Sequence, residues 1–176
     1  RLTNFSDINL GEIDFDIPQT SNLEIKKRLN KTILILSSDS GSSYLNSDGT
    51  ALDKISAEMA MLLVQQNTTL TPIEAEEITS SKKGSEYRGR ALPLMKVKSK
   101  NEQDKLINVY LNVYSGEVTA IRSMQWKIWD LMWGFHIMDW QERDNIDNLF
   151  LKIFSILALV SSITGILLFF KIDFKK

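Results

Sequence analysis

Residues 106–122, LINVYLNVYSGEVTAIR, contain two runs in which apolar and polar side chains alternate, separated by a Ser-Gly pair. Alternation with a period of two is typical of a β-strand with one buried face. Ser115-Gly116 is a turn signal, because glycine adopts the backbone angles that tight turns require. The segment therefore predicts a β-hairpin with strands over 106–114 and 117–122.

The residues before this hairpin predict the rest of a sheet and one helix packed on it. Apolar residues from Ile55 to Leu63 recur at helical spacing, and Ser56 or Asp53 is available to cap the helix N-terminus. Further strands are expected at 32–37, 42–45, 73–79 and 91–98. Pro93 places the last of these at a sheet edge, where a partner's extended segment would bind by strand addition. The predicted class is α+β, an antiparallel sheet with one packed helix.

The N-terminal residues 1–31 are expected to form an irregular lead-in. Within them, the stretch NLEIKKRL at 22–29 is interpreted as a short helix that ends near Asn30. The sequence begins with Arg1 rather than Met, so we expect a signal peptide or an N-terminal transmembrane helix to precede it.

Residues 149–170, LFLKIFSILALVSSITGILLFF, form an apolar run at the other end of the chain. From Ile153 to Phe170 there are 18 positions without a charge. As a helix rising 1.5 Å per residue, the run is roughly 33 Å long, about one hydrocarbon core. A helix on a soluble core would show a polar stripe, and here no face is polar. The run predicts a transmembrane helix over 149–171.

The charges that flank this run predict its orientation. Lys171, Lys175 and Lys176 follow it, whereas residues 139–148 before it are acidic and contain one basic residue, Arg143. By the positive-inside rule, the tail 172–176 is cytoplasmic and the globular part lies outside.

Composition excludes several classes of function. The net charge of −1 gives no basic surface of the kind that binds nucleic acid. The length of 176 residues fits one extracytoplasmic domain with one membrane anchor. The absence of cysteine excludes disulfides, thiol catalysis and zinc-thiolate sites. The sequence has no Ser-His-Asp order, glycine-rich phosphate loop or acid/base pair at a favourable spacing. We therefore predict neither an enzyme nor a resident cofactor.

Four segments in order resemble those of PepSY domain proteins. The first is LDKISAEMA at 52–60, which is similar to the family's "ISAEEA" helix, and the second is YRGRALPLMKV at 87–97, which is similar to its "YRGRPLPAYRV" strand. The third is VYLNVYSGEV at 109–118, which is similar to its "LYVDPxTGEV" hairpin. The fourth is Trp126–Trp140 with the span, which is similar to the tail of PepSY-associated transmembrane proteins. Val113 and Asn112 stand where the family usually has Pro and Asp.

The resemblance covers roughly residues 32–170 and implies a PepSY-like extracytoplasmic domain over 32–122. It further implies a Trp-rich interfacial helix and acidic connector over 123–148. The family is associated with regulatory or accessory roles outside the bacterial cytoplasm, including proposed peptidase inhibition, and with membrane proteins of iron uptake and reduction. It shares no catalytic set.

The aromatic segment before the span is the first candidate interface. Trp126, Trp129 and Trp133 are spaced to share one face of a helix, and Trp140 follows. Two compatible interpretations are open: a helix lying flat at the headgroup level, and a docking face for a partner's transmembrane helices. His136, the only histidine, is either structural or a haem ligand, and one histidine cannot supply both axial ligands within a monomer.

Three further groups carry weaker hypotheses. Ser161 and Gly165 form a small-xxx-small pair that would let another transmembrane helix approach closely. Carboxylates cluster before the span and are either calcium ligands without an EF-hand pattern or a solvated connector; they are Asp139, Glu142, Asp144 and Asp147. Basic side chains cluster in a loop that would face an acidic partner, headgroups or solvent; they are Lys82, Lys83, Arg88 and Arg90.

The function expected from the sequence is binding. The chain is interpreted as a non-catalytic accessory or regulatory subunit, anchored in the bacterial cytoplasmic (inner) membrane. It would recognise an integral membrane protein partner, or a second copy of itself, through the globular domain and the tryptophan segment. The competing hypothesis is a subunit of a membrane redox or iron-reductase complex in which His136 helps to bind haem.

Overall fold

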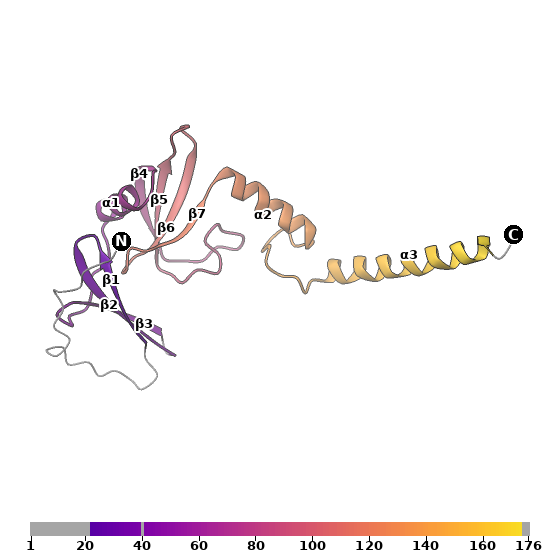
Figure 1. Cartoon of the computed structure of the whole chain (residues 1–176), viewed down its shortest axis with the longest axis horizontal. Coiled ribbons are helices and arrows are strands. Elements are labelled where there is room, and N and C mark those ends of the chain that lie inside the picture. Colours follow the sequence, from indigo (N-terminus) through magenta and orange to yellow (C-terminus); the bar gives the residue numbers. More distant parts are fainter. Residues whose placement is uncertain (1–21, 40, 174–176) are drawn as a thin grey trace. The chain divides into compact units, whose positions relative to one another are not determined.

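A computed structural model describes residues 22–39 and 41–173 of the chain (Figure 1). Contacts divide the chain into two compact parts: a sheet unit (Arg1–Lys82 and Tyr87–Met124) and a helix unit (Lys83–Glu86 and Gln125–Lys176). The elements are β1 (Asn22–Arg28), β2 (Lys31–Ser38), β3 (Gly41–Asn46), α1 (Ala57–Asn67), β4 (Thr71–Ile78), β5 (Leu94–Lys100), β6 (Leu106–Asn112), β7 (Val118–Arg122), α2 (Met124–His136) and α3 (Leu149–Asp173). The α+β class is confirmed. Residues 1–21 of the expected lead-in and 174–176 of the expected tail lie outside the described residues.

The predicted hairpin is confirmed as β6 and β7. At its turn, the Asn112 side-chain oxygen accepts hydrogen bonds from the backbone N–H groups of Tyr114 and Ser115, at 2.8 and 3.0 Å. Gly116 has a φ of +73°, and a Cβ there would lie 2.6 Å from a methyl carbon of Leu63 on α1. Glycine is therefore required at this turn both by its backbone angle and by the helix that packs against it.

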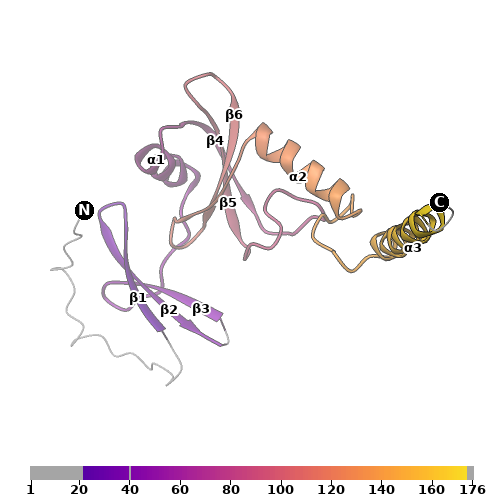
Figure 2. The ribbon, with the colours of Figure 1, turned by 45° about the vertical axis from the view of Figure 1, so that its right-hand side comes forward.

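The hairpin belongs to a four-stranded antiparallel sheet in the order β4-β5-β6-β7, and α1 packs on one face of it (Figures 1 and 2). Of the two expected caps, Ser56 is confirmed, because its hydroxyl accepts a hydrogen bond from the backbone N–H of Met59 at 3.2 Å. Buried aliphatic side chains of α1, β5 and β6 form the core between the two layers; they include Leu63, Val64, Val97, Val109 and Leu111.

The predicted edge at 91–98 is wrong. The strand in this region, β5, pairs with β4 on one side and β6 on the other, so neither of its edges is free. Pro93 precedes the strand, where its missing N–H costs no ladder hydrogen bond. Among the strands that the structure describes, β4 and β7 lie at the two edges of this sheet.

The expectation of one sheet is also wrong, because β1, β2 and β3 form a second, three-stranded antiparallel sheet. β1 replaces the short helix expected at 22–29. Its residues pair with β2 along its whole length, and Leu23 and Ile25 alternate with Glu24 and Lys26. Pairing with the buried strand β2 outweighs the local preference of this charged stretch.

The two sheets are joined at the β6–β7 turn. Arg28 is buried at the end of β1 and donates hydrogen bonds to the backbone oxygens of Asp53 and Tyr114, at 3.0 and 2.7 Å. The rings of Tyr44 and Tyr114 stack at 5.0 Å. Burial lowers the pKa of the Arg28 guanidinium, partly offset by the nearby carboxylate of Asp53.

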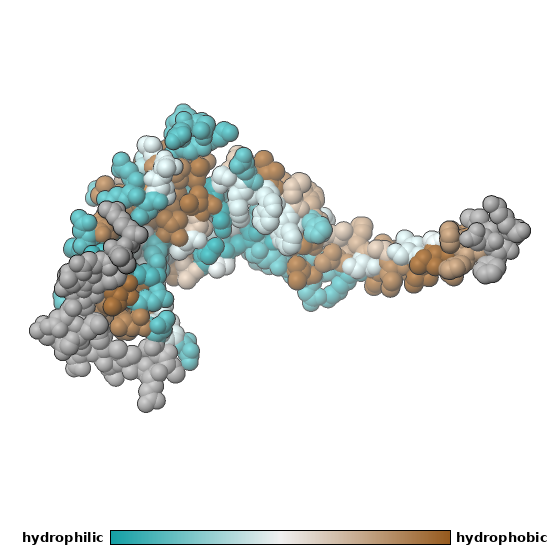
Figure 3. All heavy atoms as spheres, viewed as in Figure 1, coloured by the Kyte–Doolittle hydropathy of each residue, from teal (hydrophilic) through white to brown (hydrophobic). Residues whose placement is uncertain are grey.

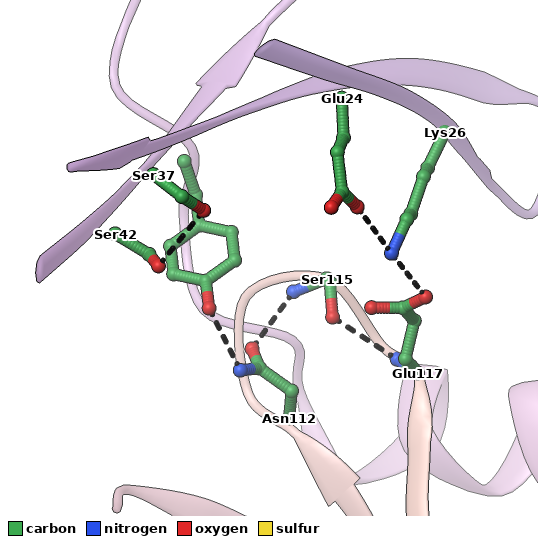
Figure 4. Close-up of polar contacts among 8 residues, drawn as sticks. Glu24, Lys26, Ser37, Ser42, Asn112, Ser115 and Glu117 are labelled. Carbon is green, nitrogen blue, oxygen red and sulfur yellow. Dashed lines mark hydrogen bonds and ion pairs between the residues drawn. The ribbon is translucent and has the colours of Figure 1, made fainter. Parts of the chain in front are cut away.

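Polar contacts at the rim of the same junction are drawn in Figure 4. Lys26 on β1 bridges Glu24 of its own strand and Glu117 beside the turn, at 2.8 and 2.7 Å. Asn112 donates a hydrogen bond to the hydroxyl oxygen of Tyr44 at 2.9 Å. The same turn therefore contacts β1 and β3, which makes it the point where the small sheet is held to the larger one.

Candidate functional site

The candidate site is the helix unit, and its geometry begins at the C-terminus of α2. The backbone N–H of Asp139 donates to the oxygen of Gly134, and that of Met138 donates to the oxygen of Phe135, at 3.0 and 3.2 Å. Met138 has a φ of +56°. These are the two hydrogen bonds and the left-handed residue of a Schellman cap, which ends the helix and turns the chain into the connector.

Asp139 organises the connector that follows. Its carboxylate accepts hydrogen bonds from the backbone N–H groups of Gln141, Glu142, Asp144 and Asn145, at 3.1 to 3.3 Å. Desolvation, the largest single influence, raises the pKa of the Asp139 carboxyl, but the four donors together bring that pKa below its ordinary value. Of the carboxylates interpreted as either calcium ligands or a solvated connector, that of Asp139 thus accepts hydrogen bonds from the backbone of the connector.

A buried ion pair returns the connector to α2. The Asp130 side chain is only 1% exposed, and Arg143 donates to it at 2.7 Å. Gly134 makes this approach possible, since a Cβ there would lie 2.9 Å from the backbone oxygen of Asp139 and 3.0 Å from the Arg143 side chain. A buried carboxylate needs such a partner, because an unpaired buried charge is strongly destabilising.

Asn148 joins the connector to both helices. Its side-chain oxygen accepts from the backbone N–H of Leu151, which caps α3, at 2.9 Å. Its side-chain nitrogen donates to the backbone oxygens of Ile137 and Asn145, at 2.7 and 2.9 Å. One side chain therefore connects the end of α2 with the start of α3.

The four tryptophans that were predicted to form an interface lie in two places. Trp129 and Trp133 stack on α2 with their ring centres 6.1 Å apart, while Trp126 is half-buried on the same side of the helix. Trp140 lies beyond the helix, and its ring contacts those of Phe135 and Phe150, at 6.2 and 5.9 Å. It connects the end of α2 to the first turn of α3.

A second row of exposed side chains on α2 was missed at the sequence level. Ile128 and Met132 are 56% and 54% exposed, and Phe135 lies beside them one turn further on. We call Ile128, Leu131, Met132 and Phe135 the aliphatic ridge. The spacing of three and four between its members is a sequence signal that could have predicted this row. It was missed because only the tryptophans of this helix were considered as an apolar face.

His136 is exposed at the last residue of α2, with its ring 5.8 Å from that of Trp133. Within residues 22–39 and 41–173, no group of three or more His, Asp or Glu residues is arranged to hold a metal ion. Glu142 and Asp147 of the carboxylate cluster pair with Lys83 and Lys152, at 2.6 Å in each case. The hydrogen bond to Glu142 raises the pKa of Lys83, one of the four loop bases.

The helix α3 is long and apolar enough to cross a membrane. Its stretch Leu149–Lys171 has a mean hydropathy of 2.5 in its most apolar window, and no part of that window is buried in the structure. Figure 3 shows its side chains as hydrophobic over most of the helix.

Within this helix, Ser162 and Thr164 donate their hydroxyls to carbonyls four residues earlier, at 2.9 and 2.8 Å. Their polar groups are thus satisfied without a second helix. The predicted pair of small residues, Ser161 and Gly165, lies on exposed turns of α3, with open space beside Gly165.

Comparisons of the chain with protein-family models, curated proteins and solved structures find no match. The resemblance to PepSY domains therefore remains a prediction. The arrangement described above provides one uncovered apolar helix, one helix with an exposed apolar face, and a polar connector between them.

Proposed function

We propose that this chain is a membrane-anchored, non-catalytic binding subunit whose sheet unit recognises a protein partner outside the bacterial cytoplasm. One observation carries the proposal: α3 is an exposed apolar helix of membrane-spanning length, while the sheet unit has a buried core of its own. An uncovered apolar helix is costly in water and stable in a bilayer, where its backbone hydrogen bonds are all internal.

The orientation in the proposal comes from the flanking charges. Lys171 is at the far end of α3 and is followed in sequence by two more lysines, whereas the connector before α3 is rich in carboxylates. This bias favours a cytoplasmic C-terminus in the bacterial inner membrane and an external sheet unit.

The order of elements in the sheet unit supports a PepSY-like accessory or regulatory role. The segments that resemble the family fall on α1, on the loop and strand leading through β5, and on the β6–β7 hairpin. The added sheet β1–β3 has no counterpart in the quoted motifs, and Arg28 holds it to that hairpin by donating to the backbone oxygen of Tyr114 at its turn. The proposal therefore concerns a binding module with one extra layer.

We place partner binding at the free edge of β7, because the two free edges of the larger sheet differ. β4 carries Pro72, a register shift after it and three glutamates, which are the features that protect an edge from further pairing. β7 contains neither proline nor a carboxylate, and Ile121 on it is 46% exposed. Its outer edge pairs with no further strand within residues 22–39 and 41–173, and such an edge suits strand addition by an extended segment of a partner.

The test is copurification from native membranes with a matched pair of variants. Ile121→Lys adds a charge to the β7 edge, and Ile73→Lys adds the same charge to β4, where Ile73 is similarly exposed at 48%. We expect a protein that copurifies with the wild-type chain to be lost with Ile121→Lys and retained with Ile73→Lys. Loss in both variants, or in neither, would contradict binding at β7, and the absence of any copurifying protein would contradict the accessory role.

A further inference from the structure

We propose that the aliphatic ridge of α2 binds the interfacial region of the lipid bilayer through apolar contact that does not depend on lipid charge, with Trp129 and Trp133 at the level of the lipid headgroups. The inference rests on the proposed function in one respect, that α3 crosses this bilayer. It selects a lipid surface, rather than a partner's transmembrane helices, as the occupant of the exposed face of α2.

The first support is the division of α2 into two sides. Asp130, Gly134 and the start of the cap face the connector and are buried, whereas Ile128 and Met132 on the opposite side are more than half exposed. A short helix with one apolar exposed side and one polar side is the pattern of a helix that lies in the membrane interface.

The tryptophans mark the border between these two sides. Trp126 is half-buried next to the connector side, and Trp129 and Trp133 lie between it and the ridge. Indole rings favour the headgroup level, where the ring is in an apolar setting and the N–H reaches water. The ridge would then lie deeper than the tryptophans, at the boundary of the acyl chains.

The second support is continuity with the span. Trp140 contacts Phe135 of the ridge and Phe150 of α3, so aromatic contacts run without interruption from one helix to the other. Asn148 adds a polar connection between the same two helices. When α3 crosses a bilayer, the apolar surface of α2 is therefore connected to the first turn of the membrane-spanning helix.

The charges of the unit provide no means of selecting anionic lipid. Within the helix unit, the lysine and arginine side chains that precede the span or lie in its first turn each pair with a carboxylate within 2.7 Å; they are Lys83, Lys127, Arg143 and Lys152. Surfaces that select anionic lipids carry clusters of unpaired lysine and arginine instead. Binding of the ridge should therefore depend on apolar area and not on lipid charge.

The test uses the full chain reconstituted in phosphatidylcholine vesicles that contain lipid brominated near the headgroup end of its acyl chains. All four tryptophans of the chain lie in this unit, so quenching reports on it alone. We expect blue-shifted, quenched emission that is unchanged when phosphatidylglycerol or salt is added. Water-like emission, or quenching that appears only with the anionic lipid, would overturn the proposal.

A matched pair of double variants assigns the effect to the ridge. Ile128→Ser with Met132→Ser should at least halve the quenching, whereas Leu62→Ser with Ile73→Ser, which changes equally exposed apolar residues of the sheet unit, should leave it unchanged. All forms should resist extraction by carbonate. If all forms resist extraction but the ridge variant leaves the quenching unchanged, this inference alone would be overturned. If carbonate extracts the wild type, the proposed anchor and this inference would be overturned together.

Discussion

Replacing Arg28 with methionine should loosen the small sheet by about 3 kcal/mol. The guanidinium donates to two backbone oxygens, at 3.0 and 2.7 Å, and the residue is buried. Hydrogen bonds to a charged group contribute about 1.5–3 kcal/mol each, so two of them at the lower figure give about 3 kcal/mol. Methionine keeps most of the apolar stem beside Gly116, so two lost hydrogen bonds dominate the change.

Hydrogen exchange of the full chain in detergent micelles measures this effect. A loss of about 3 kcal/mol corresponds to roughly hundredfold faster exchange of amides in β1 and β2. Peptides from α3 provide an internal reference within the same sample. The matched control is Lys31→Met, which removes the same charge at an exposed position paired with Arg28 in register. Acceleration below about fivefold, or an equal effect of the control, would refute the role assigned to Arg28.

Three further outcomes are expected. Ser99→Ala should raise the stability of the sheet unit by about 1 kcal/mol in chemical unfolding, because the buried Ser99 hydroxyl has no partner among the described residues; a loss of stability would contradict this. Gly134→Ala should cost about 1–3 kcal/mol by crowding the connector, seen as faster exchange over 137–148, whereas Gly165→Ala, with open space around it, should not. The folded pKa of Asp139 lies below the ordinary 3.8, so its stabilising contribution is complete above pH 3.8 and is lost as the pH falls through the folded pKa. The stability difference between the wild type and Asp139→Asn should accordingly shrink on acidification, and a difference that grows would contradict the cap.

Elements with a strong local pattern could be predicted from the sequence. The β6–β7 hairpin has alternation and a turn signal, α1 has helical spacing and a cap, and α3 has a long uncharged run. Each of these signals lies within the element itself, so no knowledge of distant pairing is needed. The α+β class follows from them.

The remainder depends on contacts between distant residues. β1 is rich in Lys, Arg and Glu, and only its pairing with β2 makes it a strand. The interior position of β5 is invisible in its own residues, because Pro93 suggests an edge whether it lies within the strand or just before it. In the candidate site, Asp130 and Arg143 are 13 residues apart, and their ion pair requires the cap at Met138 and the absence of a side chain at Gly134.

Cysteine labelling in intact cells tests the central claim, an anchored chain with its sheet unit outside. The chain has no cysteine, so Glu102→Cys, in an exposed turn of the sheet unit, and Lys175→Cys, after the span, each give a single reactive site. We predict that an impermeant thiol reagent labels position 102 from outside and labels position 175 only after permeabilisation. Labelling of position 175 in intact cells, or protection of position 102, would contradict the account.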